Sequence, residues 1–316
     1  MGLAFIAPAL AFTVALAFSE GAAVGGEALI TNQPGDSLSI VELATMKSVA
    51  EIKIDGKPAG VALSPDKATA YVTAPDGREL IEVDATQRMI KRHLKLGGGP
   101  LGIAAHPAKP EVYVADWYAH KIIVVDAVKL EVVAEIAVGQ SPSGLAVTPD
   151  GKILLSADRD SNAVSFVDLA TRTVVATVAT GERPFGVTID DSGQRAFTAN
   201  VASDDVTVID LVTRKVTGRV PAGRRPYAVA LAKGLGFITD QYSGTVTVFD
   251  AATLKAAKTI EACDHPEGIE ADAAGASVYV ACWGDNVILK IDTDTLAITG
   301  KAAVGDGPRA FGKFLR

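Results

Sequence analysis

Two cysteines are the residues of this sequence with the clearest chemical potential. Cys263 lies three residues before Pro266, and Cys282 follows 19 residues after Cys263. In an exported protein such a pair most simply forms a disulfide, and closing a loop of about 20 residues would stabilise the fold by roughly 3 kcal/mol. Thiolates also bind zinc or copper, so a metal site and two free thiols are the alternatives that the sequence leaves open.

Three further residues define the metal alternative. His265, Glu267 and Asp240 are expected to lie close to the two cysteines. Thiolates, an imidazole and carboxylates can hold a divalent metal, as in a metal-assisted lyase or lactonase. The sequence contains no Cys-x-x-Cys or His-Glu-x-x-His spacing, no haem-attachment motif, no phosphate-binding loop and no nucleophile elbow. We therefore predict no cofactor, with a divalent metal as the alternative.

A second set of candidates combines guanidinium groups with aromatic rings. Arg183, Phe185, Arg225 and Tyr227 flank two prolines in consecutive repeat units, and we expect them to be near neighbours. Such a cluster suits a small anionic ligand, and Trp, Tyr and Arg are also frequent where a protein partner docks. The alternative interpretation is packing and solvated surface charge. The candidate binding residues are Trp117, Tyr118, Arg159, Arg183, Phe185, Arg225, Tyr227, Asp240, Tyr242, Trp283 and Arg309.

A repeat of about 42 residues must position all of these candidates. Its most regular marker is a proline column, and every gap in that column is 42 residues except one of 40. Short runs rich in Val, Ile, Leu and Phe, bounded by Gly, Pro, Asp and Asn, indicate four strands in each unit. The column consists of Pro58, Pro100, Pro142, Pro184, Pro226, Pro266 and Pro308.

Seven such units predict an all-β fold, a seven-bladed β-propeller with four-stranded blades. Residues 309–316 suffice for one innermost strand, and the segment near residues 28–32 matches a second strand. We therefore expect the last blade to be closed by N- and C-terminal strands together, in a single domain over residues 27–316. Because one blade cannot bury its own apolar faces, each blade of the ring needs a neighbour on both sides.

The propeller geometry divides the loops between two faces. The loops before each innermost strand and after each second strand share one face, called the top face here. The Pro-Asp-Gly turns and the Asp-x-x-Thr turns share the other, called the bottom face. All the candidate residues above belong to top-face loops or the strand ends beside them. A second column of the repeat consists of acidic residues on the bottom face. Their side chains are expected to hydrogen-bond the backbone of their own turns: Glu42, Asp84, Asp126, Asp168, Asp210, Asp250 and Asp292.

The second strands carry a family resemblance. Tyr71-Val-Thr-Ala74, Tyr113-Val-Ala-Asp116, Phe197-Thr-Ala-Asn200, Phe237-Ile-Thr-Asp240 and Tyr279-Val-Ala-Cys282 resemble the YVTN-type β-propeller repeat family. The resemblance covers residues 27–316. It implies a periplasmic or surface propeller, some of which occur beside quinoprotein dehydrogenases, and the architecture also resembles the heavy subunit of bacterial amine dehydrogenases. An accessory role in a periplasmic redox system is among the implied functions.

The N-terminal residues predict export. Residues 1–26 match a signal peptide, with an apolar run from Leu3 to Phe18 followed by small residues, although no Lys or Arg precedes the run. A membrane tether is the alternative. The expected mature chain is periplasmic or secreted, has no membrane span and is a monomer. Its net charge of -7 argues against nucleic-acid binding, which requires a cationic surface.

Two functional hypotheses follow from the sequence. The first is an exported binding scaffold whose top-face loops hold a small anionic ligand or a periplasmic protein partner. The second is an enzyme, either the metal-assisted lyase or lactonase built on His265, Glu267 and Asp240, or a dehydrogenase-associated subunit. Whether the protein is an enzyme is left open by the sequence, because propeller active sites are gathered from loops that are far apart in the chain.

Overall fold

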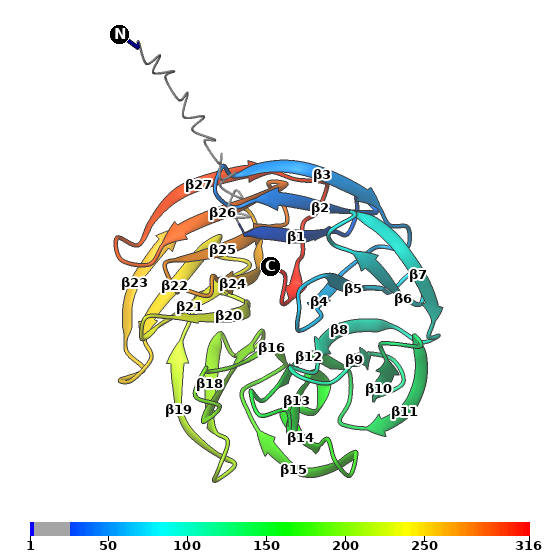
Figure 1. Ribbon diagram of the computed structural model, residues 1–316. Helices are drawn as coiled ribbons and strands as arrows, with labels where there is room; N and C mark the ends of the chain where they lie inside the picture. Colours follow the sequence, from blue (N-terminus) through cyan, green and yellow to red (C-terminus); the bar gives the residue numbers. More distant parts are fainter. Residues whose placement is uncertain (3–25) are drawn as a thin grey trace.

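The computed structural model describes residues 1–2 and 26–316, and the predicted seven-bladed β-propeller is confirmed (Figure 1). The expected signal peptide lies in the segment outside the described residues, apart from its ends. Each blade is an antiparallel sheet whose strands follow one another from the ring axis outward. No helix within residues 26–316 is long and apolar enough to cross a membrane.

The strands of each blade are given from the axis outward. Blade 1 contains β4 (Gly60–Leu63), β5 (Thr69–Ala74), β6 (Glu79–Asp84) and β7 (Met89–Lys95). Blade 2 contains β8 (Pro100–Ala105), β9 (Glu111–Asp116), β10 (Lys121–Asp126) and β11 (Glu131–Ala137). Blade 3 contains β12 (Pro142–Val147), β13 (Ile153–Asp158), β14 (Ala163–Asp168) and β15 (Thr173–Ala179), with a short 3-10 helix at Arg159–Ser161.

The remaining blades repeat this order. Blade 4 contains β16 (Pro184–Ile189), β17 (Arg195–Asn200), β18 (Asp205–Asp210) and β19 (Lys215–Pro221). Blade 5 contains β20 (Pro226–Ala232), β21 (Leu235–Asp240), β22 (Thr245–Asp250) and β23 (Ala256–Glu261). Blade 6 contains β24 (Pro266–Ala271), β25 (Ser277–Cys282), β26 (Val287–Asp292) and β27 (Ala297–Ala303). Blade 7 contains β1 (Glu27–Asn32), β2 (Ser37–Glu42) and β3 (Lys47–Lys53) outside the C-terminal segment.

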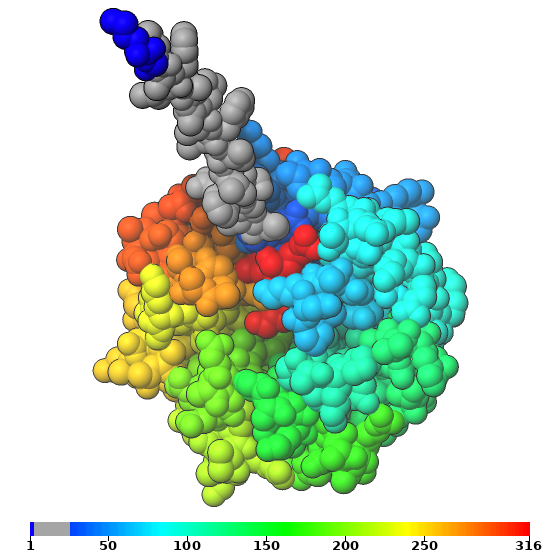
Figure 2. Space-filling view, in the orientation of Figure 1, coloured from blue at the N-terminus to red at the C-terminus, as the bar shows by residue number. Residues whose placement is uncertain are grey.

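The chain ends close blade 7 as expected. The backbone N–H of Leu29 donates to the carbonyl of Phe314 at 2.9 Å, and that of Arg309 donates to Thr31 at 2.7 Å. The C-terminal segment is thus the innermost strand of blade 7 and lies at the ring centre (Figures 1 and 2). Its short strand β28 (Phe311–Gly312) also pairs parallel with β4 of blade 1, a contact that the repeat did not predict. The seam therefore joins two blades.

Close approach of the innermost strands explains the Pro-x-Gly pattern. A Cβ atom on Gly102 would lie 1.6 Å from the carbonyl oxygen of Ser143 in the next blade. The same construction places a Cβ on Gly144 at 2.5 Å from the carbonyl of Phe185. Real Cβ atoms do not approach backbone oxygens this closely, so glycine is needed where a strand meets its neighbour near the axis.

Hydroxyl groups satisfy the same inter-blade carbonyls. Thr73, the third residue of the Tyr-Val-Thr motif, donates its hydroxyl to the carbonyl of Leu101 at 2.6 Å. Thr239 donates to Glu267 at 2.7 Å, and Thr31 donates to Ala59 at 2.8 Å. These carbonyls follow the proline of the next blade and are buried between blades, where an unpaired oxygen would be costly. The motif threonine therefore links consecutive blades.

The six aspartates of the acidic column behave as predicted, whereas Glu42 accepts the side-chain hydroxyl of Thr45. Asp126 accepts the backbone N–H groups of Val128 and Lys129, both at 2.9 Å, and five of its equivalents cap their turns in the same way. These backbone hydrogen bonds lower the pKa of Asp126 and of Asp210. The carboxylates belong to the bottom-face turns, so much of the negative charge of the chain is explained by the fold.

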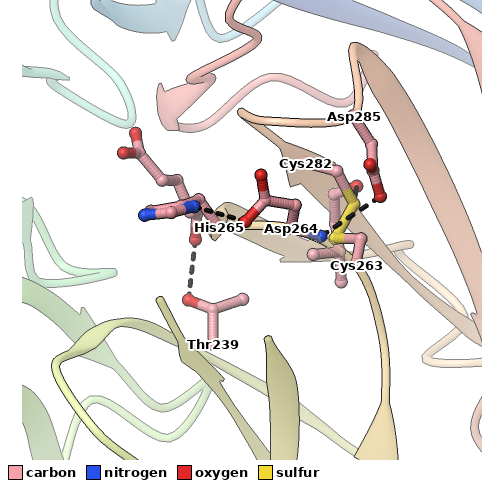
Figure 3. The surroundings of a disulfide bond; sticks show 8 residues. Thr239, Cys263, Asp264, His265, Cys282 and Asp285 are labelled. Atoms are coloured by element: carbon pink, nitrogen blue, oxygen red, sulfur yellow. Dashed lines mark hydrogen bonds and ion pairs between the residues drawn. A yellow bond between two sulfur atoms is a disulfide. The ribbon is translucent and has the colours of Figure 1, made fainter. Parts of the chain in front are cut away.

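The two cysteines form a disulfide, which decides between the three alternatives that the sequence left open (Figure 3). Cys282 stands where other second strands end in Asp or Asn, and it pairs with Pro266 across the blade. In blades 3 and 5 this place is held by a hydrogen bond from Gly139 N–H to Asp158 at 3.1 Å and from Gly223 N–H to Asp240 at 2.9 Å. The Cys263–Cys282 bond therefore replaces that hydrogen bond covalently.

The first prediction concerns the glycine column. Gly102→Ala forces a methyl group against the Ser143 carbonyl, so we expect a loss of about 1–3 kcal/mol in the free energy of unfolding. Gly77→Ala is the matched control, because the nearest atom to its Cβ is the flexible carboxylate end of Glu79 at 3.1 Å. Urea unfolding of both variants measures the difference. Equal midpoints for Gly102→Ala and the wild type would contradict this account of the axis.

The second prediction concerns the disulfide. Replacing Cys263 and Cys282 together by Ser should cost roughly 3 kcal/mol, because the unfolded chain regains the freedom of the closed loop. Thermal unfolding of the double variant and of reduced wild type should show matching decreases in Tm. A Tm of the wild type that does not respond to reductant, together with an intact mass two hydrogens too heavy, would overturn the assignment.

Candidate functional site

Four aromatic side chains from distant parts of the chain meet at the top end of the ring axis. We call Trp117, Phe185, Tyr227 and Phe311 the central aromatic cluster. The Phe185 ring centroid lies 4.7 Å from that of Tyr227, 4.9 Å from that of Phe311 and 6.3 Å from that of Trp117. Phe185 and Tyr227 directly follow the prolines that begin β16 and β20, so the top ends of these strands direct both rings toward the axis.

A buried polar network lies beside this cluster. Arg309 donates its Nε–H to the Tyr227 hydroxyl at 2.8 Å and an Nη1–H to Gln33 at 2.7 Å. The Arg309 Nε atom also lies 3.1 Å from Glu267 Oε2, while Gln241 donates to Glu267 Oε1 at 2.5 Å. Because Arg309 Nε–H is directed at Tyr227, Glu267 Oε2 is held by charge rather than by a directed hydrogen bond.

Burial sets the charge states in the network. Burial raises the pKa of the Glu267 carboxyl, and the Arg309 charge and the Gln241 hydrogen bond act against that rise. Burial lowers the pKa of Arg309, but the Glu267 carboxylate reverses this effect and the net direction is upward. Burial also raises the pKa of Tyr227. Breaking one member of a buried ion pair is strongly destabilising, so this network fixes the C-terminal segment against blades 5 and 6.

A row of exposed and half-buried rings crosses the rim of blades 5 and 6. The Arg225 guanidinium lies 4.7 Å from the Tyr242 ring centroid, and the Tyr242 ring lies 5.6 Å from that of His265. His265 in turn lies 6.0 Å from Trp283. We call Arg225, Tyr242, His265 and Trp283 the rim row. The four residues come from four top-face loops, two before innermost strands and two after second strands.

A second exposed patch lies at blades 2 and 3. The Arg159 guanidinium lies 5.4 Å from the Trp117 ring and makes an ion pair with Asp160 at 2.6 Å. Arg183 is exposed, with its Nε atom 4.0 Å from the same Asp160. Tyr118 is 75% exposed and Tyr242 is 51% exposed, whereas Trp117 is half-buried. The top face thus presents aromatic rings that are accompanied by arginines.

The structure separates the residues of the predicted anion site. Phe185 and Tyr227 belong to the central aromatic cluster, Arg225 belongs to the rim row, and Arg183 lies beside Asp160. Asp240 is buried and accepts hydrogen bonds from Thr245 at 2.9 Å and Thr247 at 2.7 Å, so it supports the blade. Burial raises the pKa of Asp240. The guanidinium groups of Arg183 and Arg225 therefore have different neighbours.

The members of the metal alternative also face different partners. His265 Nδ1 lies 2.6 Å from Asp264 (Figure 3), whereas Glu267 faces Arg309. The cysteine sulfurs are bonded to each other and are not available as thiolates. Among the residues that the structure describes, no group of three or more His, Cys, Asp and Glu side chains could hold a metal ion.

A cavity on the ring axis was not predicted from the sequence. It measures about 700 Å³ and is lined by the lower halves of the innermost strands, and Phe311 lies at its inner end. A signal was present in the sequence, because the position four residues after several column prolines is alanine. These small residues line the cavity: Ala62, Ala104, Ala146 and Ala230.

Comparison with known proteins shows the fold alone. No family model and no curated protein matches the chain. A solved structure of Kuenenia stuttgartiensis hydrazine synthase matches with a TM-score of 0.75 and 20% identity over 89% of this chain and 99% of that chain. A functionally unknown protein from Desulfotomaculum acetoxidans matches with a TM-score of 0.80 and 13% identity over 90% of this chain and 98% of that chain. The chain is therefore similar to other propellers, and the YVTN-type motif stays a resemblance.

Proposed function

We propose that this chain is an exported binding scaffold whose top face docks a protein partner. The observation that carries the proposal is the exposure of Tyr118 and Tyr242 on one rigid face, where Arg225 stacks on Tyr242 and Arg159 stacks on Trp117, the residue before Tyr118. Tyr, Trp and Arg are the residues that most often dominate binding energy at protein interfaces. The structure supports no comparable feature on the bottom-face turns, whose exposed apolar residues are single valines.

The electrostatics favour a protein over a small anion at this face. Arg309 is neutralised by Glu267, and Arg159 is paired with Asp160. A small anion would have to compete with these carboxylates for the guanidinium groups. A protein surface can use the rings and the stacked arginines together without breaking either ion pair.

Rigidity supports the same proposal. The rim row is ordered by stacking before any partner arrives, so binding would lose little side-chain freedom. The Cys263–Cys282 disulfide lies at the base of this row and fixes the loop that carries His265. A disulfide is typical of oxidising compartments, which supports a periplasmic or secreted location.

A more specific form of the proposal is an accessory role in a periplasmic redox system, as the motif resemblance implies. Support by fold analogy comes from the hydrazine synthase structure, in which a whole chain of similar size is such a propeller. The enzyme hypothesis has less support, because His265, Glu267 and Asp240 are engaged by different neighbours.

The third prediction tests the docking face. A photo-crosslinking residue at position 118 should capture a protein from the envelope fraction of the native host, and mass spectrometry identifies it. Binding of that purified partner should weaken at least tenfold in the Tyr118→Ala, Tyr242→Ala double variant, because each ring is a candidate for about 1–2 kcal/mol of binding energy.

The control uses the opposite face. Val128 and Val212 are 68% and 80% exposed in bottom-face turns, so Val128→Ala and Val212→Ala should leave the partner's Kd unchanged. All variants should keep the wild-type Tm, since none of these side chains is buried. A partner whose affinity falls equally in both sets, or only in the valine variants, would contradict docking at the top face.

A further inference from the structure

The axial cavity is built like a ligand site on the side of the ring opposite to the proposed docking face. Its volume of about 700 Å³ falls in the range of small-molecule pockets, which is roughly 300–1,000 Å³. Exposed residues of the bottom-face turns, among them Lys67 and Lys233, line its mouth. Phe311 lines its inner end and packs in the central aromatic cluster. The cavity therefore opens among the bottom-face turns, and the central aromatic cluster lies at its other end.

Most side chains of the cavity wall are apolar, and the polar ones are Thr188 and the charged residues of the mouth. The apolar side chains of the wall are small or aliphatic, including Ala104, Ala146, Val147, Ile189 and Leu231. All five are half-buried within the ring, which means that they keep surface facing this space. Water in such a space gains few hydrogen bonds from the side chains, and an apolar group of suitable length would release it.

The mouth is polarised by charge. Glu270 is buried at its edge, and Glu270 Oε2 accepts the backbone N–H groups of Phe314 and Leu315 at 2.5 and 2.8 Å. Lys313 Nζ lies 3.6 Å from Glu270 Oε1. Burial raises the pKa of Glu270, and the charges of both Lys313 and Lys67 act to lower it. Lys313 follows β28 and Lys67 lies in the turn after β4, and these two strands pair, so the two lysines share this side of the mouth.

Two ammonium groups thus face one carboxylate that is already engaged. Within residues 26–316 Lys67 takes part in no ion pair, whereas Lys233 is paired with Asp294 at 2.7 Å. Two more acidic residues line the mouth, and one of them, Asp272, follows Glu270 by two residues in blade 6. Asp191 belongs to blade 4, and Asp272 caps its own turn through Ala276 N–H at 2.9 Å. Lys67 and Lys313 therefore leave one ammonium group at this part of the mouth without a carboxylate partner of its own.

We propose that this cavity binds an amphiphilic anion, with its apolar tail inside the ring and its acid group at Lys67 and Lys313. A chain with a terminal carboxylate meets both conditions, because the lysines can hold the oxygens while the alanine and aliphatic wall covers the tail. The site shares no residue with the docking face, so it is independent of the proposed function.

Isothermal titration with decanoate, below its micellar concentration, tests the proposal on the full mature chain. We expect one bound decanoate per chain, and decyltrimethylammonium, which has the same tail and the opposite charge, should bind at least tenfold more weakly. The Lys67→Gln, Lys313→Gln double variant should lose at least fivefold in decanoate affinity. Lys152→Gln is the matched control, because Lys152 is an exposed bottom-face lysine that does not line the cavity.

A cavity-filling variant provides the second test. Ala104→Leu with Ala146→Leu places added volume in the cavity and should abolish decanoate binding while the circular dichroism spectrum is retained. If this variant does not fold, the lysine variants decide alone, since both side chains are exposed. Absence of decanoate binding, equal affinity for the cationic analogue, or equal binding by the lysine double variant and Lys152→Gln would each overturn the proposal.

Discussion

The ring depends on how closely seven innermost strands can approach one axis. Gly60 and Gly102 leave room for carbonyl oxygens of the next blade, and Thr73 supplies a hydroxyl to the oxygen that Gly60 faces, that of Leu101. Each blade therefore needs the neighbour that fills its gap and pairs its polar groups. The repeat length follows from this constraint, because every unit must bring a proline, a glycine and a hydroxyl to the same height on the axis. Side chains outside these positions are free to vary, and the candidate sites use that freedom.

Much of the fold could be predicted because its signals recur in the chain. A proline column and an acidic column at one period define both the blades and the faces on which their loops lie. The disulfide was also predictable, since Cys263 and Cys282 replace two consensus positions that meet across a blade. The partners of Arg309 were not predictable, because Gln33 and Glu267 are not part of the repeated pattern and lie far apart in the sequence. The inward direction of Phe185 depends on a bulge after Pro184 that no local pattern reports. The cavity lies where the lining side chains are small. A search of the sequence for chemical groups does not detect small residues, so the cavity was not predicted.

The two faces of the ring have different physical character. At the top, the central aromatic cluster and the Arg309–Glu267 pair fill the axis, so function there must use the surface. At the bottom, a cavity lined partly by alanines lies on the axis, so a ligand can bind inside the ring there. Phe311 belongs to both regions and comes from the C-terminal segment. Occupation of the lower axis would therefore press on the same segment that the upper network holds.

The closure of blade 7 by the two chain ends has a consequence for the synthesis of the protein. The N–H of Ala310 donates to the hydroxyl of Thr31 across 279 residues of sequence, so one edge of β1 has no partner until almost the whole chain has left the ribosome. An open strand edge invites pairing with other chains, and contacts this distant in sequence form slowly. During synthesis, β1 thus keeps an open edge until the last residues of the ring are made, although all six of its residues are buried once the ring has closed.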